Sequence, residues 1–429
     1  MGSSIPTLSE IRVEGFKALA GLAKLEVRPL TILAGANSSG KSSAIQPLLL
    51  LKQTLASPST PDVLELAGPN VSFTEYSQLF APGRESMRFG FRVDSAAAPL
   101  DVDVHYSLGG TSKLTLRRQE VGIATRKLIL EPALSSKEIE TLMPGLPEAV
   151  GGRRIDLKVV VSRGFLRVAS SFPDGAPEST DFWISDPANP LPKLLLNLIH
   201  IPGLRGNPQR DYPLRSIAGP RFDGHFQDYV AGIIAAWPEE ERKRLGDALR
   251  HLGLTWKVEA KRVDATRVEV RVGRLLSPKK GGGKDLVSIA DVGFGVSQVL
   301  PVLVALQVAR PGQLVYLEQP EIHLHPRAQR SLARLLADAA QGGGRFLVET
   351  HSSLLLRGIQ TLVAQGKLDP AIVKLHWFRR SESTGLTEII AADLDENGAF
   401  GSEWPEDFDD THLESEQAYL DAVEARLAR

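Results

Sequence analysis

The sequence predicts an α/β fold that is split along the chain by a mixed α+β insertion with an antiparallel sheet. Three observations carry this prediction. A strand, a glycine-rich loop and a helix follow one another between residues 30 and 55. After residue 285, helices alternate with short apolar strands, as in a parallel sheet covered by helices. Between these parts, apolar residues alternate with polar ones in several runs, which indicates antiparallel strands.

The composition narrows the class of protein. A chain of 429 residues is long enough for two or three domains, or for one large domain with an insertion. Its 50 Lys and Arg residues nearly balance 51 Asp and Glu residues, so any surface that binds nucleic acid must be local. The absence of cysteine excludes disulfides, thiolate metal sites and cysteine nucleophiles. Without a long apolar run or a secretory signal pattern, we expect a cytoplasmic protein that does not enter a membrane.

The first part of the fold is predicted from local patterns. Strands are expected at Ile11–Glu14 and Leu25–Ala34, and a helix begins after the glycine-rich loop. Pro47 removes one backbone hydrogen bond and should bend this helix near its first turns.

The insertion is predicted to contain both strands and helices. Runs with period two predict strands at Met87–Val93, Val102–Tyr106 and Ile155–Val161. Helices are expected at Leu194–Leu198, at Phe226–Trp237 and from Pro238 to near Gly253, followed by a hairpin at Lys257–Val272.

The last part is predicted to alternate between helix and strand. Helices are expected at Val296–Val308, Arg327–Ala340 and Ser353–Ala364, and strands at Leu314–Leu317, Phe346–Val348 and Ile372–Phe378.

The glycine-rich loop matches the pattern G-x-x-x-x-G-K-S from Gly35 to Ser42. Such a loop wraps backbone N–H groups around phosphates at a helix N-terminus, whose partial positive charge favours anions. Lys41 would reach the β- and γ-phosphates of ATP, and the Ser42 hydroxyl would bind Mg²⁺. A chance match in a Gly/Ser turn is the alternative, but the strand-loop-helix context favours a P-loop NTPase.

A P-loop site also needs an acidic residue at the end of a buried neighbouring strand. Glu318 follows the apolar run Leu314–Leu317 and is predicted to bind Mg²⁺ directly or through one of its ligands. A solvated carboxylate at a strand end is the alternative. The next strand also ends in polar residues, Glu349–His351, and parallel strands gather their sites at that edge.

With these motifs in order, the chain resembles the ABC-type ATPases of the RecF, SMC and OLD lineage, sometimes labelled AAA-like. The resemblance rests on Ile11–Lys17, the P-loop, His200–Arg205, Asp291–Gln298, Glu318–Pro326 and Glu349–Ser352. It implies an ABC-type ATPase head whose signature motif is Gly295–Gln298, which in the family contacts the γ-phosphate bound by the other subunit of a sandwich homodimer. It also implies an inter-subunit loop at Leu324–Pro326 and a switch histidine at His351.

Simpler interpretations of these motifs stay open. In one alternative, Gly295 and Ser297 only cap the helix that follows them. In another, His323, His325 and His351 form a metal cluster.

The sequence departs from the family at one catalytic position. Gln319 stands where the family usually has the glutamate that polarises the attacking water, and an amide cannot accept a proton. Hydrolysis is therefore expected to be slow. Three alternatives follow. Glu321 replaces Gln319 as the base, or the phosphate and His351 activate the water. Otherwise the protein acts mainly as a clamp that stays bound to ATP.

The predicted site and domains follow from these motifs. Catalytic candidates are Glu318, Gln319, Glu321 and His351, and the metal candidates are Ser42 and Glu318. Nucleotide-binding candidates are Gly35, Ala36, Asn37, Ser38, Ser39, Gly40, Lys41, Ser42, Ser43, Gly295, Ser297 and Gln298. The predicted divisions are the first ATPase part (1–95), the insertion (96–284), the second ATPase part (285–380) and a C-terminal hairpin with an acidic tail (381–429).

Three weaker signals have competing interpretations. The basic loop with Arg274, Lys279, Lys280 and Lys284 is either a DNA-backbone contact or a solvated loop. Arg205 and Arg210 either reach a phosphate or tie a rigid loop to the core. The acidic residues 393–396 and 406–410 raise the question of a nuclease, but OLD-type nucleases continue into a Toprim domain, and a solvated tail is expected instead.

The resemblance implies an ATPase that dimerises on ATP and regulates a DNA transaction or a separately encoded effector nuclease, in DNA repair or anti-phage defence. The main alternative is a non-hydrolysing ATP-dependent sensor or scaffold. A transporter ATPase subunit and a P-loop kinase are disfavoured by the long insertion and by the signature and switch motifs.

Overall fold

The computed structural model describes residues 5–58, 63–96, 98–110, 113–144, 149–150, 153–171, 190–215, 219–277 and 285–401, together with 417, 420, 421 and 426. Within these residues, no helix is both long and apolar enough to cross a membrane.

The core of the molecule is a sheet of six strands in the order β12-β17-β18-β3-β19-β20 among the described residues. The first five strands pair in parallel, and β20 pairs antiparallel with β19. The strands are β3 (Leu30–Gly35), β12 (Ile199–Ile201), β17 (Leu314–Glu318), β18 (Arg345–Thr350), β19 (Val373–Arg380) and β20 (Thr387–Ala392).

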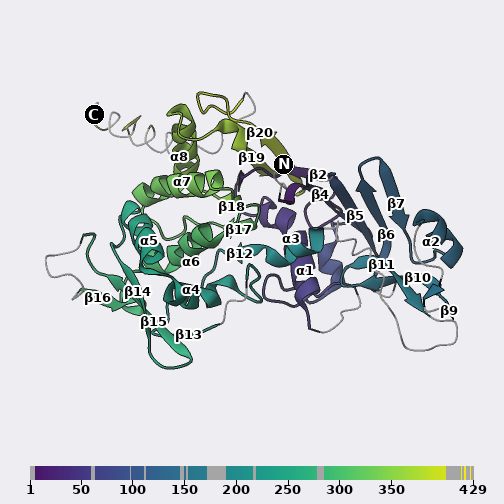
Figure 1. The fold of residues 1–429 in the computed structure, drawn as a ribbon. Helices are drawn as coiled ribbons and strands as arrows, with labels where there is room; N and C mark the ends of the chain where they lie inside the picture. Colours follow the sequence, from purple (N-terminus) through teal and green to yellow (C-terminus); the bar gives the residue numbers. More distant parts are fainter. Residues whose placement is uncertain are drawn as a thin grey trace.

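Helices cover both faces of this sheet (Figure 1). Leu33 on β3 packs on one side with α1 (Lys41–Ala56) and α3 (Leu191–Asn197). Its neighbours Ile32 and Ala34 point to the other side, because successive side chains of a strand alternate between faces. The helices on that second side are α4 (Val230–Ala236), α5 (Glu239–His251), α6 (Phe294–Val308), α7 (Pro326–Gln341) and α8 (Ser353–Ala364).

A second, antiparallel sheet lies beyond α1 and α3 (Figure 1). Its strands, in spatial order, are β2 (Ala23–Glu26), β1 (Thr7–Glu14), β4 (Ser86–Asp94), β5 (Leu100–Leu108), β6 (Leu114–Ile123) and β7 (Arg126–Leu130). The hairpin β10 (Asp156–Ser162) and β11 (Phe165–Ser171) and the helix α2 (Ser136–Leu142) flank it, with the short pair β8 (Ala149–Val150) and β9 (Arg153–Arg154).

A third sheet packs beside α4 and α5. It contains β13 (Tyr212–Pro213), β14 (Val258–Arg262), β15 (Arg267–Gly273) and β16 (Leu286–Ser288). Short 3₁₀ turns occur at Tyr76–Leu79 (η1), Phe226–Tyr229 (η2), Ile289–Asp291 (η3) and Pro370–Ile372 (η4).

The α/β alternation after residue 285 is confirmed, and the predicted helix Ser353–Ala364 has the same bounds in the structure. The antiparallel strands and the hairpin of the insertion are also confirmed. The predicted helix Phe226–Trp237 begins as a 3₁₀ turn, and α1 continues through Pro47.

The prediction of a single strand at Leu25–Ala34 is wrong. The chain forms β2 in the antiparallel sheet and β3 in the central sheet, with a turn between them. Pro29 cannot donate to a strand ladder, and the Arg28 amide donates instead to the Thr31 hydroxyl at 2.8 Å. This break carries the chain from one sheet to the other.

Strand pairing crosses the predicted domain divisions. β4 and β5 are neighbours in one sheet although the 95/96 division runs between them. β12 comes from the predicted insertion, and β20 from the predicted tail, yet both belong to the central sheet. The pairing partner of a strand depends on contacts between distant residues, which the local pattern does not contain.

Candidate nucleotide-binding site

The P-loop connects β3 to α1 and needs glycine at two positions. Gly35 has a φ of 143°, and a Cβ there would lie 2.2 Å from the Phe378 carbonyl oxygen. Gly40 has a φ of 99°, and its Cβ would lie 2.3 Å from the Thr387 hydroxyl. Side chains are therefore excluded at both ends of the loop. The Thr387 hydroxyl donates to the Ser39 carbonyl at 2.8 Å and holds the loop from β20.

Lys41 points back into the loop. Its ammonium donates to the carbonyls of Gly35 at 3.1 Å and Ala36 at 2.8 Å, and it lies 3.4 Å from the Ser39 hydroxyl. Burial lowers its pKa, while the charges of Glu349 and Glu321 act in the opposite direction. The first amides of a helix have no intrahelical partner, so Lys41, Ser42 and Ser43 at the start of α1 present N–H groups beside this ammonium. This arrangement suits an anion.

The carboxylate in contact with Ser42 belongs to Glu349, not to Glu318. The Ser42 hydroxyl lies 3.0 and 2.9 Å from the two carboxylate oxygens of Glu349, and the Tyr316 hydroxyl donates to one of them at 2.7 Å. Burial raises the pKa of Glu349, and the charge of Glu318 adds to this effect. A hydroxyl and a carboxylate are hard oxygen ligands, so this pair fits Mg²⁺.

Glu318 lies one strand further from the P-loop, because β18 is placed between β17 and β3. Its carboxylate lies 2.9 Å from Nε2 of His200 and accepts from the Gly203 amide at 3.0 Å. Burial acts to raise the pKa of Glu318, but His200, the Gly203 amide and Arg205 outweigh it and lower this pKa. The two carboxylates therefore have opposite pKa shifts on neighbouring strands.

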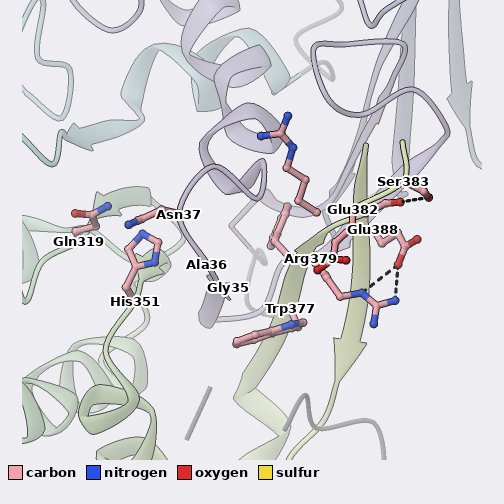
Figure 2. Close-up of a pocket in the computed structure, with 13 residues that line it drawn as sticks. Gly35, Ala36, Asn37, Gln319, His351, Trp377, Arg379, Glu382, Ser383 and Glu388 are labelled. Carbon is pink, nitrogen blue, oxygen red and sulfur yellow. Dashed lines mark hydrogen bonds and ion pairs between the residues drawn. The ribbon is translucent and has the colours of Figure 1, made fainter. Parts of the chain in front are cut away.

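An open pocket of about 1050 Å³ lies in front of the P-loop. Figure 2 shows Asn37, Gln319 and His351 together on one side of the loop, and Trp377 of β19 on the other. Burial, together with the charge of Lys41, lowers the pKa of His351, while a hydrogen bond to the Gly35 backbone opposes this shift. The lowered pKa favours the uncharged imidazole, and an amide and an imidazole thus face the same space.

Glu321 does not line this pocket. It is buried, and one carboxylate oxygen accepts from the Thr350 hydroxyl at 2.6 Å and from the His351 amide at 3.1 Å. Burial raises its pKa, and the other oxygen is buried without a hydrogen-bond partner among the described residues. These contacts place Glu321 behind His351, where it holds the backbone of that residue.

The predicted signature residues lie on α6 and do not line the pocket. The alternative that Gly295 and Ser297 cap this helix is wrong, because the helix begins at Phe294 after Gly293. The Ser297 hydroxyl donates to the Phe294 carbonyl at 3.0 Å, and Phe294 itself is 52% exposed. Within the first turn of α6, Phe294 therefore faces solvent, whereas Val296 is buried.

The two arginines of the 202–210 loop bind the protein itself. Arg205 is buried and donates to the carbonyls of Gln298, Glu318 and Gln319. Arg210 forms an exposed ion pair with Asp291 at 2.8 Å. Both contacts agree with a loop tied to the core rather than with a phosphate contact.

The remaining histidines and acidic residues make structural contacts or fall outside the described residues. His325 accepts from the Arg327 amide and caps α7. No group of three or more His, Asp or Glu side chains suited to a metal occurs in the part of the chain that the structure describes. Asp393 pairs with Lys374 and Arg28. The predicted basic loop and tail are mostly not described, since Lys279, Lys280, Lys284 and the acidic residues 406–410 lie outside the described ranges.

A family model described as "AAA domain, putative AbiEii toxin, Type IV TA system" matches residues 30–357, which is more than half of the chain. The chain belongs to this AAA-domain family. The matched range of the AAA-domain protein begins at β3 and ends within α8, so it includes the P-loop, Glu318 and His351. Membership confirms the predicted resemblance to AAA-like ATPases, and the family and fold are those of a nucleotide-binding ATPase.

Solved structures with similarity to this AAA-domain protein include three SMC heads. The SMC head domain from Thermotoga maritima is 13% identical, with a TM-score of 0.42, over 90% of this chain and 98% of that chain. An SmcHead bound to the C-winged helix domain of ScpA is 12% identical, with a TM-score of 0.48, over 91% and 98%. An Smc head domain with an extended coiled coil, bound to the C-terminal domain of ScpA derived from Pyrococcus furiosus, is 11% identical, with a TM-score of 0.43, over 98% and 100%. No curated protein matches the chain in sequence.

Proposed function

We propose that this AAA-domain protein binds Mg-ATP in the pocket before the P-loop and hydrolyses it slowly. One arrangement carries the proposal: a buried lysine inside the loop, a hydroxyl–carboxylate pair at the start of α1, and Gln319 and His351 facing the same pocket. Each part matches a task in phosphoryl transfer, which depends mainly on positioning and charge stabilisation.

The residues have separate roles in this proposal. Lys41 and the first amides of α1 bind the phosphates, while Ser42 and Glu349 hold Mg²⁺, which neutralises phosphate charge when it is bound. His351 lines the same pocket and hydrogen-bonds to the γ-phosphate, and its lowered pKa favours the uncharged imidazole. Gln319 orients a water molecule but cannot take its proton, and this makes turnover slow.

A second candidate function is a non-hydrolysing ATP sensor or scaffold. Gln319 favours it, because it replaces the acidic residue expected at this position. In both functions, ATP joins two copies head to tail through the first turn of α6, where Phe294 is exposed, and the cycle controls a DNA transaction or a separately encoded nuclease. This wider role in repair or anti-phage defence comes from the lineage, not from a residue of the site.

Phosphate release with Mg-ATP, measured with and without DNA, tests the proposal. We expect wild-type release to exceed that of Lys41→Ala, which should also bind ATP at least about tenfold more weakly because its charged contacts are lost. Lys367→Ala is the control, since Lys367 is exposed and its ammonium bonds only to Gln365 among the described residues. ATP binding without release above Lys41→Ala would support the sensor instead. Absence of ATP binding would contradict both functions.

A further inference from the structure

Residues 200–206 run from the end of β12 into the following loop, and they touch both the signature helix and the end of the acidic strand β17. His200 and Gly203 bind the carboxylate of Glu318, as described above. His200 also stacks on Tyr316, with ring centroids 5.4 Å apart and an interplanar angle of 10°. This segment therefore lies against β17 and the carboxylate at its end, without lining the pocket in front of the P-loop.

Arg205 joins two elements through one buried side chain that is 7% exposed. One terminal nitrogen donates to the Gln298 carbonyl in α6 at 3.0 Å. The other donates to the Glu318 carbonyl at 2.8 Å and to the Gln319 carbonyl at 3.0 Å. A planar guanidinium can donate hydrogen bonds to acceptors on two sides in this way. A lysine ammonium is a compact point charge and cannot span both sides.

The contact between this segment and α6 is reciprocal. The Gln298 side-chain amide donates to the Arg205 carbonyl at 3.2 Å and to the Gly206 carbonyl at 2.9 Å. Gln298 is buried, so its polar side chain depends on these partners. The position of α6 and the position of residues 205–206 are thus fixed to each other.

Arg205 connects α6 to Gln319, and the backbone of Gln319 is strained. Its φ is +44°, a left-handed conformation that a side chain with a Cβ seldom adopts. The surrounding segments hold it there: its amide donates to the Glu349 carbonyl at 2.8 Å, and its carbonyl accepts from Arg205 and, at 3.1 Å, from the Ile322 amide. Strain of this kind persists only where neighbouring groups determine the backbone, and it gathers at functional sites.

We propose that Arg205 is a positioning residue that couples the signature helix α6 to Gln319. It fixes the strained backbone from which the Gln319 amide reaches the pocket, and it links that backbone to the α6 turn carrying Gly295 and Ser297. A displacement of α6 on contact with a partner is transmitted to Gln319 through this guanidinium. The inference rests on the proposed ATPase function and adds a route by which the exposed face of α6 regulates it.

The variant Arg205→Lys tests this role, because it keeps the positive charge but loses the two guanidinium nitrogens that donate to different elements. We expect kcat to fall at least tenfold, while KM for ATP and the affinity for a fluorescent ATP analogue stay within threefold of wild type. Arg210→Lys is the matched control in the same loop, since its ion pair with Asp291 is exposed. It should leave all three quantities unchanged. Wild-type kcat in Arg205→Lys, or an equal loss of binding and turnover, would overturn the proposal.

Hydrogen exchange supplies a readout that does not depend on turnover. In Arg205→Lys and in Gln298→Met, the amides of Gln319 and Ile322 should exchange at least tenfold faster, whereas those of α1 stay unchanged. If Arg205→Lys does not fold, Gln298→Met alone decides, and unchanged exchange in it counts against the coupling. A wild type that binds ATP without releasing phosphate would contradict the proposed hydrolysis, and the exchange result would still decide the role of Arg205.

Discussion

At the scale of single residues, the site depends on which of two carboxylates serves the P-loop. Glu349 contacts the Ser42 hydroxyl and has a raised pKa, whereas Glu318 is bound by His200 and the Gly203 amide and has a lowered one. Glu349 lies on the strand next to β3 and against the Ser42 hydroxyl, whereas Glu318 lies one strand further from the P-loop. The contacts thus favour Glu349 as the residue nearest to bound Mg²⁺.

Glu349→Gln should weaken Mg²⁺ binding in the presence of a non-hydrolysable ATP analogue by at least about tenfold, because loss of a carboxylate near a metal typically costs this much. Glu318→Gln is the control and should change Mg²⁺ affinity by less than about threefold. Titration with Mn²⁺, followed by electron paramagnetic resonance, measures this without turnover. If Glu318→Gln gave the larger loss, the assignment would revert to the one that the sequence predicts.

At the scale of elements, the hairpin of β19 and β20 supports the P-loop from outside the nucleotide fold that the motifs define. The Thr387 amide donates to the Ala18 carbonyl at 2.9 Å, and its hydroxyl binds the Ser39 carbonyl. Gly40 lies against the same side chain. One residue at the start of β20 therefore connects the N-terminal segment, the P-loop and the C-terminal hairpin.

Thr387→Val keeps the shape of this side chain and removes its donor. We expect it to lower the free energy of unfolding by about 1 kcal/mol and ATP affinity by about threefold, because the Ser39 carbonyl loses its partner and the loop loosens. Thermal unfolding and ATP titration measure the two effects. Thr361→Val on α8 removes an exposed hydroxyl that bonds to the Arg357 carbonyl, and it should change neither. Equal effects of the two variants would show that Thr387 does not hold the loop.

At the scale of the whole molecule, the α6 surface and the P-loop pocket do not meet within one copy. Gly295 and Ser297 do not line the pocket, while Phe294 and Leu204 are 52% and 88% exposed. An exposed phenylalanine at the start of a helix suits contact with another apolar surface. This arrangement is compatible with the proposed ATP-linked dimer, in which α6 of one copy would face the pocket of the other.

Ser297→Arg should prevent dimer formation in Mg-ATP and leave ATP binding to the monomer within about threefold, because a bulky cation would enter the shared face. Sedimentation velocity with and without a non-hydrolysable analogue measures the dimer. Thr141→Arg on α2, in the antiparallel part of the fold, is the control and should dimerise like wild type. Dimers that form equally in Ser297→Arg would exclude α6 from the interface.

The sequence by itself determined the features that depend on neighbouring residues. The P-loop is readable because the glycines, Lys41 and Ser42 act within a few positions of one another. The bounds of α8 and the alternation of helices and strands after residue 285 follow equally from local periodicity and capping. The pattern of motifs also predicted the family, which the match to residues 30–357 confirms.

Only the tertiary structure decided which side chains meet. Ser42 and Glu349 are 307 residues apart, and Arg205 and Gln319 are 114 apart, so no local pattern indicates either contact. The break at Pro29 and the addition of β12 and β20 to the central sheet depend on strand order in the same way. The residues of a motif are close in sequence, so the sequence shows what they can bind. Whether Glu318 or Glu349 meets Ser42 depends on which strand lies beside β3.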